Sequence, residues 1–99
     1  MGMSGPIFEW DERKNSANRK KHGVSFDEAQ SAFYDENARV LCDPEHSEEE
    51  DRFVLLGLSA SLRLLVVCHC YRQKDEVVRI ISARKADRNE QQQYRWWLR

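Results

Sequence analysis

Apolar residues gather in the second half of the chain in three short runs, which predict β-strands at 52–59, 62–71 and 76–83. Each run is rich in leucine or β-branched residues, the types that suit a pleated and half-buried surface. The turn-like breaks at 59–61 and 72–75 are too short for a parallel crossover, which needs about a dozen residues or more. The pattern therefore predicts an antiparallel meander.

Two shorter segments also have strand character. Residues 7–10 alternate between apolar and polar types, which predicts a first strand or an edge piece, and residues 38–42 predict another short strand. The acidic stretch 45–51 then precedes the meander and is typical of a solvated loop. His46 within this stretch has no companion histidine at ligand spacing, so it predicts no metal site.

The first third of the chain predicts a helix over 12–22. Asp11 has the chemistry to cap its start, and Gly23 stands where a left-handed residue commonly ends a helix. The segment is polar and basic with few apolar residues, so this helix must lie on the rim of the core.

A second helix should begin at Ser25, which is predicted to form a capping box with Glu28. In that arrangement each side chain accepts a hydrogen bond from the backbone amide of the other residue. The helix should end near Tyr34 or Asp35. Its apolar residues recur at helical spacing and should face the sheet: Phe26, Ala29, Ala32 and Phe33.

A last helix follows Arg84, because Asp87 and Glu90 repeat the capping-box spacing. Its predicted inner face is formed by Tyr94, Trp97 and Leu98. Trp96 falls outside that face, and it either packs on the sheet with Trp97 or is exposed and meets a partner.

Together these elements predict an α+β fold, with two N-terminal helices packed on a small antiparallel sheet, a meander, and a C-terminal helix. The 99 residues should form one domain, 7–99, after a disordered N-terminal lead, 1–6. We expect these core contacts: Phe26, Ala29 and Phe33 against Val54, Leu56, Val66 and Ile80 or Ile81.

Charge is distributed unevenly along the chain. Residues 27–51 hold ten acidic residues against the single Arg39, whereas residues 62–99 hold nine basic residues against four acidic ones. The basic C-terminal third would give a polyanion one preferred surface, and the alternative is a solvated surface of mixed charge.

The three cysteines do not predict a disulfide framework. Cys68 and Cys70 share one face of a strand with their Cα atoms about 6.5 Å apart, at the long end of disulfide geometry. The motif with His69 is no zinc signature, because His69 points to the opposite face and no second ligand pair follows. We expect a reduced cytoplasmic protein with neither a signal peptide nor a membrane span.

Several segments in order resemble the BrnT family of toxins, and the resemblance covers nearly the whole chain. The segments are Phe8-Glu9-Trp10-Asp11, Asn15 and Asn18, Lys21 to Ala29, Asp43 to Ser47, Arg52 to Gly57, Leu64 to His69 and Arg79 to Ala86. Many relatives carry Thr and then an acidic residue after the histidine, whereas this chain has Cys70 and Tyr71. That departure leaves the general base unassigned.

The resemblance implies the toxin of a type II toxin–antitoxin pair, a metal-independent endoribonuclease that cleaves RNA, inhibits growth and needs no cofactor. It implies a fold similar to the RelE-type ribonucleases. The implied partner is a BrnA-type antitoxin with a ribbon–helix–helix part, and the two proteins together should repress their operon, so that operator DNA is bound only through the antitoxin.

A metal-independent ribonuclease must stabilise charge on the phosphate and transfer protons, and the predicted meander offers candidates for both tasks. Arg84, at a strand end before a helix N-terminus, and Arg79 are the candidate phosphate-stabilising residues. His69 is the candidate proton-transfer residue. Lys85 and Arg88 would position phosphates around the site and so bind RNA.

Each assignment has a structural alternative. Arg79 would instead bridge to Glu9 or another N-terminal acidic residue, and His69 would be a satisfied structural histidine. Strand register also leaves two arrangements open. A five-residue loop would place His69 opposite Arg79, whereas a four-residue loop pairs His69 with Val78 and leaves Ser82 and Arg84 on its face.

A different class of function also fits the sequence. The protein would then be a non-catalytic RNA- or protein-binding module that acts with a ribbon–helix–helix partner in transcriptional autoregulation. A metal-dependent nuclease is the weakest possibility, because no carboxylate cluster stands in the predicted meander.

Overall fold

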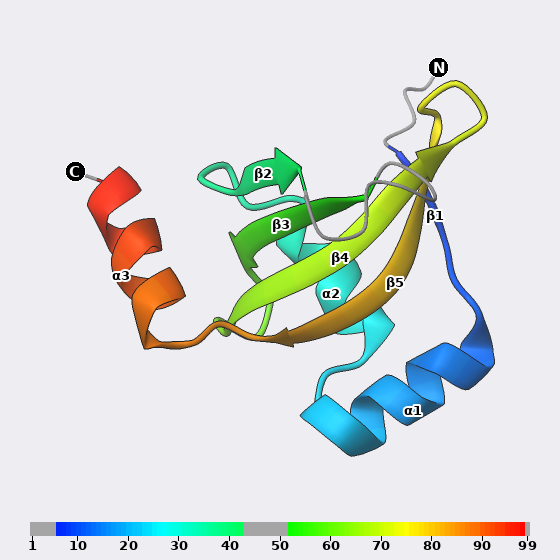
Figure 1. The fold of residues 1–99 in the computed structure, drawn as a ribbon, viewed down its shortest axis with the longest axis horizontal. Coiled ribbons are helices and arrows are strands. Elements are labelled where there is room, and N and C mark those ends of the chain that lie inside the picture. Colours follow the sequence, from blue (N-terminus) through cyan, green and yellow to red (C-terminus); the bar gives the residue numbers. More distant parts are fainter. Residues whose placement is uncertain (1–5, 43–51, 99) are drawn as a thin grey trace.

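The computed structural model describes residues 6–42 and 52–98, and it shows three helices and a five-stranded sheet (Figure 1). The predicted acidic loop 45–51 and nearly all of the predicted lead 1–6 lie outside the described residues. The elements are β1 (Ile7–Glu9), α1 (Glu12–His22), α2 (Phe26–Ala32), β2 (Arg39–Cys42), β3 (Phe53–Leu58), β4 (Leu64–Arg72), β5 (Val77–Lys85) and α3 (Arg88–Trp97).

The sheet has the order β1-β5-β4-β3-β2 and is mixed. The meander β3-β4-β5 and the antiparallel β2 confirm the predicted strands and their short connections. The expectation of a wholly antiparallel sheet was wrong at one edge, where β1 pairs with β5 in parallel. A three-residue strand separated from its partner by most of the chain carries no local signal for its direction.

The first helix is held to the sheet by polar side chains, because α1 buries only Asn15 and Asn18 among its residues. Asn18 Nδ2 donates to the carbonyls of Val24 and Ala83, at 2.9 and 2.8 Å, and Asn18 Oδ1 accepts from the Ala83 amide at 3.1 Å. Asn15 Oδ1 accepts from the Phe26 amide at 2.8 Å. The side-chain amides of Asn15 and Asn18 thus hold α1, which has no apolar stripe, against the rest of the fold.

Both predicted caps of α1 are confirmed. The Asp11 carboxylate accepts from the Arg13 amide at 2.8 Å, and Gly23 ends the helix at a φ of +70°. Since that conformation disfavours any residue with a Cβ, the glycine is required by the backbone.

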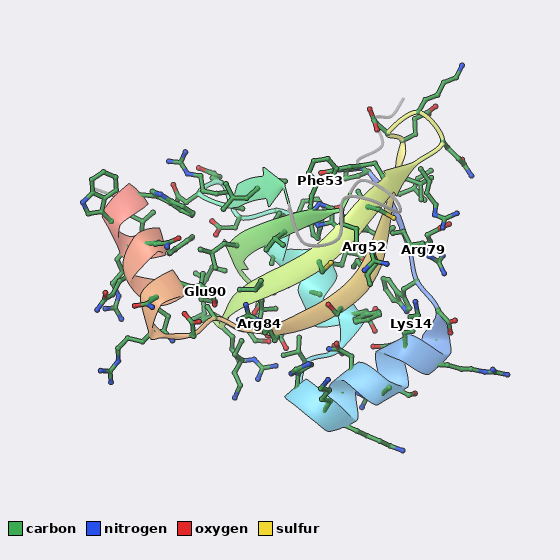
Figure 2. All side chains as sticks on the ribbon, viewed as in Figure 1. Lys14, Arg52, Phe53, Arg79, Arg84 and Glu90 are labelled. Atoms are coloured by element: carbon green, nitrogen blue, oxygen red, sulfur yellow. The ribbon has the colours of Figure 1, made fainter. Side chains whose placement is uncertain are left out.

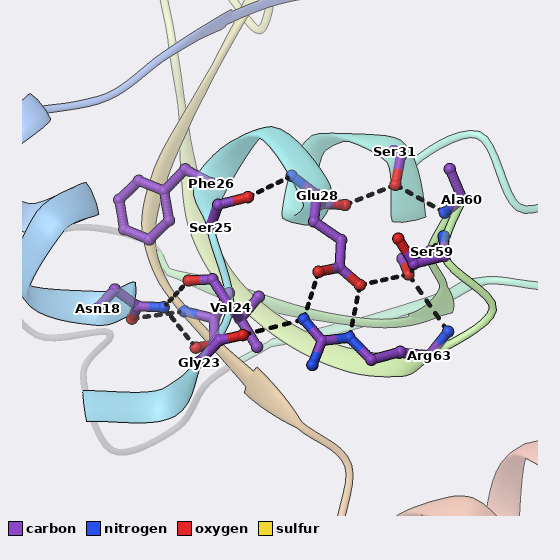
Figure 3. A network of polar contacts seen from close by, with 12 residues as sticks. Asn18, Gly23, Val24, Ser25, Phe26, Glu28, Ser31, Ser59, Ala60 and Arg63 are labelled. Atoms are coloured by element: carbon purple, nitrogen blue, oxygen red, sulfur yellow. Dashed lines mark hydrogen bonds and ion pairs between the residues drawn. The ribbon is translucent and has the colours of Figure 1, made fainter. Parts of the chain in front are cut away.

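Only half of the capping box predicted for α2 is present. Ser25 Oγ accepts from the Glu28 amide at 3.1 Å, but the Glu28 carboxylate turns to the β3–β4 connection, where it pairs with Arg63 and accepts from Ser59 Oγ at 2.7 Å (Figure 3). The hydrogen bond from the Arg63 side chain is the main reason that the pKa of the Glu28 carboxyl is lowered. The predicted end of the helix was also late by about two residues, since α2 ends at Ala32 with Phe33 as its cap.

The core lies between the two N-terminal helices and one side of the sheet, which we call the helix face. Its buried residues are Val24, Phe26, Ala29, Ala32, Leu55, Leu65, Val67, Ile80 and Ala83. The prediction that Val54, Leu56 and Val66 contact α2 was wrong, because these three side chains belong to a second cluster on the opposite side, with α3. The strands are apolar on both faces, so their sequence does not reveal which residues meet which helix.

The C-terminal helix has the predicted capping box between Asp87 and Glu90. It docks through Tyr94, which is buried and donates its hydroxyl to Asp35; burial and this bond raise the pKa of Tyr94 to about 12. Leu98 was predicted on the inner face but is exposed. Trp96, the side chain predicted to fall away, is 65% exposed. None of the helices described here is long and apolar enough to cross a membrane.

Replacing Phe26 with Ala tests which residues form the core. Phe26 is fully buried, and removing such a ring costs about 3–5 kcal/mol of unfolding free energy. Phe33 is half-buried, so Phe33→Ala should cost clearly less. Urea denaturation measures both, and equal losses would contradict this view of the core.

Candidate functional site

An irregularity in the β4–β5 pairing decides which side chains share a face. His69 pairs with Ile80, but the preceding residue of β4, Cys68, pairs with Ser82, so Ile81 is an extra, bulged residue in β5. Side chains alternate along a strand, and one inserted residue reverses the alternation beyond it. The bulge therefore places Arg84 on the same side of the sheet as Arg79.

We call this side the arginine face, defined by Arg79, Ser82 and Arg84 on β5 with their partners Cys70, Cys68 and Val66 on β4. Figure 2 shows Arg79 toward the β1 end of β5 and Arg84 toward α3. The two cysteines share this face, as their spacing predicted, and no disulfide joins them.

Arg79 makes the bridge that the sequence left open as its structural alternative. Its Nη1 donates to Glu9 Oε2 at 2.9 Å, and Arg72 Nε lies 3.7 Å from the same oxygen. Nε and Nη2 of Arg79 have no partner among the residues that the structure describes. The side-on edge of this guanidinium, which can donate two parallel hydrogen bonds, is therefore available.

Arg84 forms a two-pronged pair with Glu90 of α3, which lies beside it in Figure 2. Nη1 donates to Oε1 and Nη2 to Oε2, both at 2.8 Å. This pair lowers the pKa of the Glu90 carboxyl and raises the pKa of Arg84. The pair occupies the tip of the guanidinium, while the edge formed by Nε and the second Nη2 hydrogen has no partner in the described parts of the chain.

His69 lies on the helix face, away from both arginines. The ring is 0% exposed and packs edge-on against Phe33, with the ring centroids 4.8 Å apart. Nδ1 lies 3.1 Å from the Val67 carbonyl oxygen and Nε2 lies 3.2 Å from the Tyr71 hydroxyl. Burial lowers the pKa of His69, so the neutral ring is favoured.

Both predicted registers for His69 were wrong. His69 pairs with Ile80, rather than with Arg79 or Val78, and Ser82 and Arg84 lie on the opposite side of the sheet. The predicted loop has the right length but begins one residue too early, and the extra residue Ile81 then reverses the side chains after it. Periodicity cannot reveal a single inserted residue.

The two predicted RNA-contacting residues both follow Arg84 in the chain and are exposed. Lys85 is the last residue of β5, and its pairing with Leu65 assigns it to the helix face. Arg88 is the first residue of α3. The structure thus places Arg79 and Arg84 on one face, opposite β4 residues that are four positions and about 13 Å apart, and places Lys85 and Arg88 at the α3 end of β5.

The sequence reasoning missed the role of Glu90 beside Arg84. Glu90 Oε1 also accepts from the Asp87 amide at 2.8 Å, so one carboxylate both caps α3 and holds the arginine. The available signal was an acidic residue at the third helical position, six residues after a strand-end arginine. Within 6–42 and 52–98, no three His, Cys, Asp or Glu side chains gather in the way that a metal ion requires.

Comparison with known proteins identifies a family for this chain. Residues 10–90 match the family described as the ribonuclease toxin BrnT of type II toxin–antitoxin systems. The chain belongs to the BrnT family. Among solved structures, the 1.1 Å crystal structure of the Brucella abortus ribonuclease toxin BrnT has a similar fold, with a TM-score of 0.64 and 24% identity. That match covers 85% of this chain and 100% of the Brucella chain. No curated protein sequence matches.

The buried histidine predicts a pH dependence of stability. Its folded-state pKa lies below the ordinary 6.5, so the unfolded chain takes up the proton first as the pH falls. The free energy of unfolding should therefore be highest above pH 6.5 and decline as the pH falls below it. His69→Phe should remove this part of the decline, measured by urea denaturation between pH 7.5 and about 5.

His22→Gln is the matched control, because His22 ends α1 and lies outside the core. It should keep the wild-type pH dependence. If His69→Phe and wild type lost the same free energy over this range, the buried histidine would not be its source.

Proposed function

We propose that this BrnT-family protein is a metal-independent endoribonuclease whose reaction takes place on the arginine face. The observation that carries the proposal is the bulge at Ile81, which brings Arg79 and Arg84 to one side of β5 with an available edge on each guanidinium. The planar fork of arginine can donate two parallel hydrogen bonds to a phosphate. We propose that the fold is related to the RelE-type ribonucleases.

In the proposed reaction the ribose 2′-oxygen of RNA attacks the adjacent phosphorus, and the bond to the 5′-oxygen breaks. Negative charge builds up on the non-bridging phosphate oxygens, where the Nε and Nη2 hydrogens of Arg84, assisted by Arg79, stabilise it. The 2′-hydroxyl loses its proton and the departing 5′-oxygen gains one. His69 is enclosed on the other face, so we propose that water carries these protons and that His69 supports the fold.

Glu90 acts in this scheme through Arg84. Holding both terminal nitrogens of the guanidinium fixes its plane, so that the Nε edge stays directed away from α3. Such preorganisation lowers the entropy that must be lost when phosphate binds. Lys85 and Arg88, exposed beside Arg84, would position neighbouring phosphates without selecting bases.

We further propose that a BrnA-type antitoxin with a ribbon–helix–helix part neutralises the toxin in the cytoplasm, and that operator DNA is bound only through this partner. The support is membership of a type II toxin–antitoxin family and the basic character of residues 62–99. Trp96, exposed on α3, offers an apolar contact for such a partner.

Arg84→Ala tests the catalytic assignment. Losing one donor that stabilises transition-state charge typically lowers the rate by about 10²–10³-fold, so RNA cleavage and growth inhibition should nearly disappear. Arg84→Lys should restore only part of the rate, because an ammonium group lacks the planar fork. Cleavage of purified RNA with chelator present measures both variants.

Arg95→Ala is the matched control, an exposed arginine of α3 that forms no part of the arginine face. It should cleave at the wild-type rate. A folded Arg84→Ala protein that still cleaves at the wild-type rate would remove Arg84 from the mechanism. If wild type bound RNA without cleaving it, the non-catalytic binding module would be the better description.

Salt dependence tests the proposed antitoxin interface. If the partner covers basic residues with acidic ones, its dissociation constant should rise with salt, because surface charges are screened over about 8 Å at physiological ionic strength. Titration calorimetry between low and high salt measures this. An affinity that stays flat would show an interface that is chiefly apolar.

A further inference from the structure

The first helix has a charged surface that the proposed active site does not use. Its exposed residues include five cations against the single acidic Glu12, although the whole chain has a formal net charge of −1. The five cations are Arg13, Lys14, Arg19, Lys20 and Lys21. None of them makes an ion pair within the described part of the chain.

Helical geometry spreads these cations around the exposed surface of α1, with Arg13 and Lys20 opposite the buried asparagines and the other three on the two flanks. Residues seven positions apart lie two turns apart on the same side of a helix. Arg13 is therefore aligned with Lys20, and Lys14 with Lys21, with about 10 Å along the axis between the members of each pair. Asn15 and Asn18 point the other way, where they bond to the core. Figure 2 shows long side chains that extend from α1 away from the sheet.

The residues between the cations favour a nucleic acid over a protein. Ser16 and Ala17 stand in the middle of the exposed side, and a shallow hollow is lined by Ser16, Arg19 and Lys20. Protein interfaces need an apolar core of aromatic or large aliphatic side chains, and this side offers none. A phosphate backbone needs only positive charge at a suitable spacing.

The position of α1 connects this surface to the arginine face. The helix is bonded through Asn18 to Ala83 of β5, and β5 carries Arg79 and Arg84 on its other side. β1 pairs only with residues 77–79, so it ends before Ala83 and leaves the rest of this edge of β5 to α1. A strand of RNA that leaves the arginine face across this edge meets α1 next.

We propose that the exposed side of α1 binds the phosphate backbone of RNA, as a second contact for the strand held at Arg79 and Arg84. The role as a second contact rests on the proposed function, whereas phosphate binding by α1 does not. The contact would add affinity without base selection, because phosphates are the same for every sequence.

The test uses the full chain and a short single-stranded RNA with 2′-O-methyl riboses, which keeps every phosphate charge but lacks the attacking hydroxyl. Fluorescence anisotropy gives the affinity at several salt concentrations. Each lost phosphate contact on a single strand reduces the slope of log affinity against log salt by about 0.7, so Arg13→Gln/Lys20→Gln should reduce it by about 1.4.

Two matched variants accompany this double substitution. Lys74→Gln/Arg95→Gln removes the same charge from exposed positions outside α1 and should keep the wild-type slope. Arg13→Lys/Lys20→Arg keeps the charge of α1 and should also keep the slope. Lys14→Gln/Lys21→Gln repeats the experiment on the second pair if the first variant does not fold.

A wild-type slope in a folded α1 double variant would overturn the proposal. An equal loss in the Lys74→Gln/Arg95→Gln control would also overturn it, because the effect would then belong to overall charge. α1 variants that bind RNA normally but lose the antitoxin would assign this surface to a protein partner instead. Failure of the wild type to cleave ordinary RNA would contradict the proposed function and leave the binding result intact.

Discussion

The side-chain amide of Asn18 is the contact on which the arrangement of the molecule depends. It donates to the Ala83 carbonyl and accepts from the Ala83 amide. One side chain therefore makes the two hydrogen bonds that a neighbouring strand would make beyond the end of β1. Unpaired strand edges attract other chains, and here the edge is closed by a helix. The same amide bonds to Val24, so it also fixes the turn from α1 into α2.

This contact lies two residues beyond the bulge. Ala83 must point its side chain into the core and its backbone toward α1, and it does both only because Ile81 is inserted ahead of it. The register of β5 is therefore fixed from two sides, by Val67 across the ladder and by Asn18 at the edge. Arg84 takes its direction from this fixed register, which places it on the same face as Arg79.

The features that the sequence predicted well are those with local causes. Asp11, Gly23 and the box of Asp87 with Glu90 act on backbone groups a few residues away, and the meander follows from short turns. The parallel β1 and the partner of Glu28 depend on segments far apart in the chain, and the capping-box spacing at Ser25 was satisfied by only one of its two bonds.

The candidate site divides in the same way. That the arginines and His69 lie on the sheet could be inferred from their positions in apolar runs, and Glu9 was named beforehand as a partner of Arg79. Their distribution over two faces could not be inferred, because β4 and β5 are buried on both sides and one extra residue inverts the alternation. The sequence identified residues, whereas the bulge determines which of them can act together.

One carboxylate serves two structures at the start of α3, and this has a thermodynamic consequence. Glu90 Oε1 accepts from the Asp87 amide and from Arg84 at once, so the state of the first helical turn and the state of the guanidinium are linked. Such linkage is reciprocal. A ligand that binds α3, for instance at Trp96, and stabilises this helix therefore also stabilises the Arg84–Glu90 pair. Conversely, an anion that breaks this pair weakens the contact between β5 and α3.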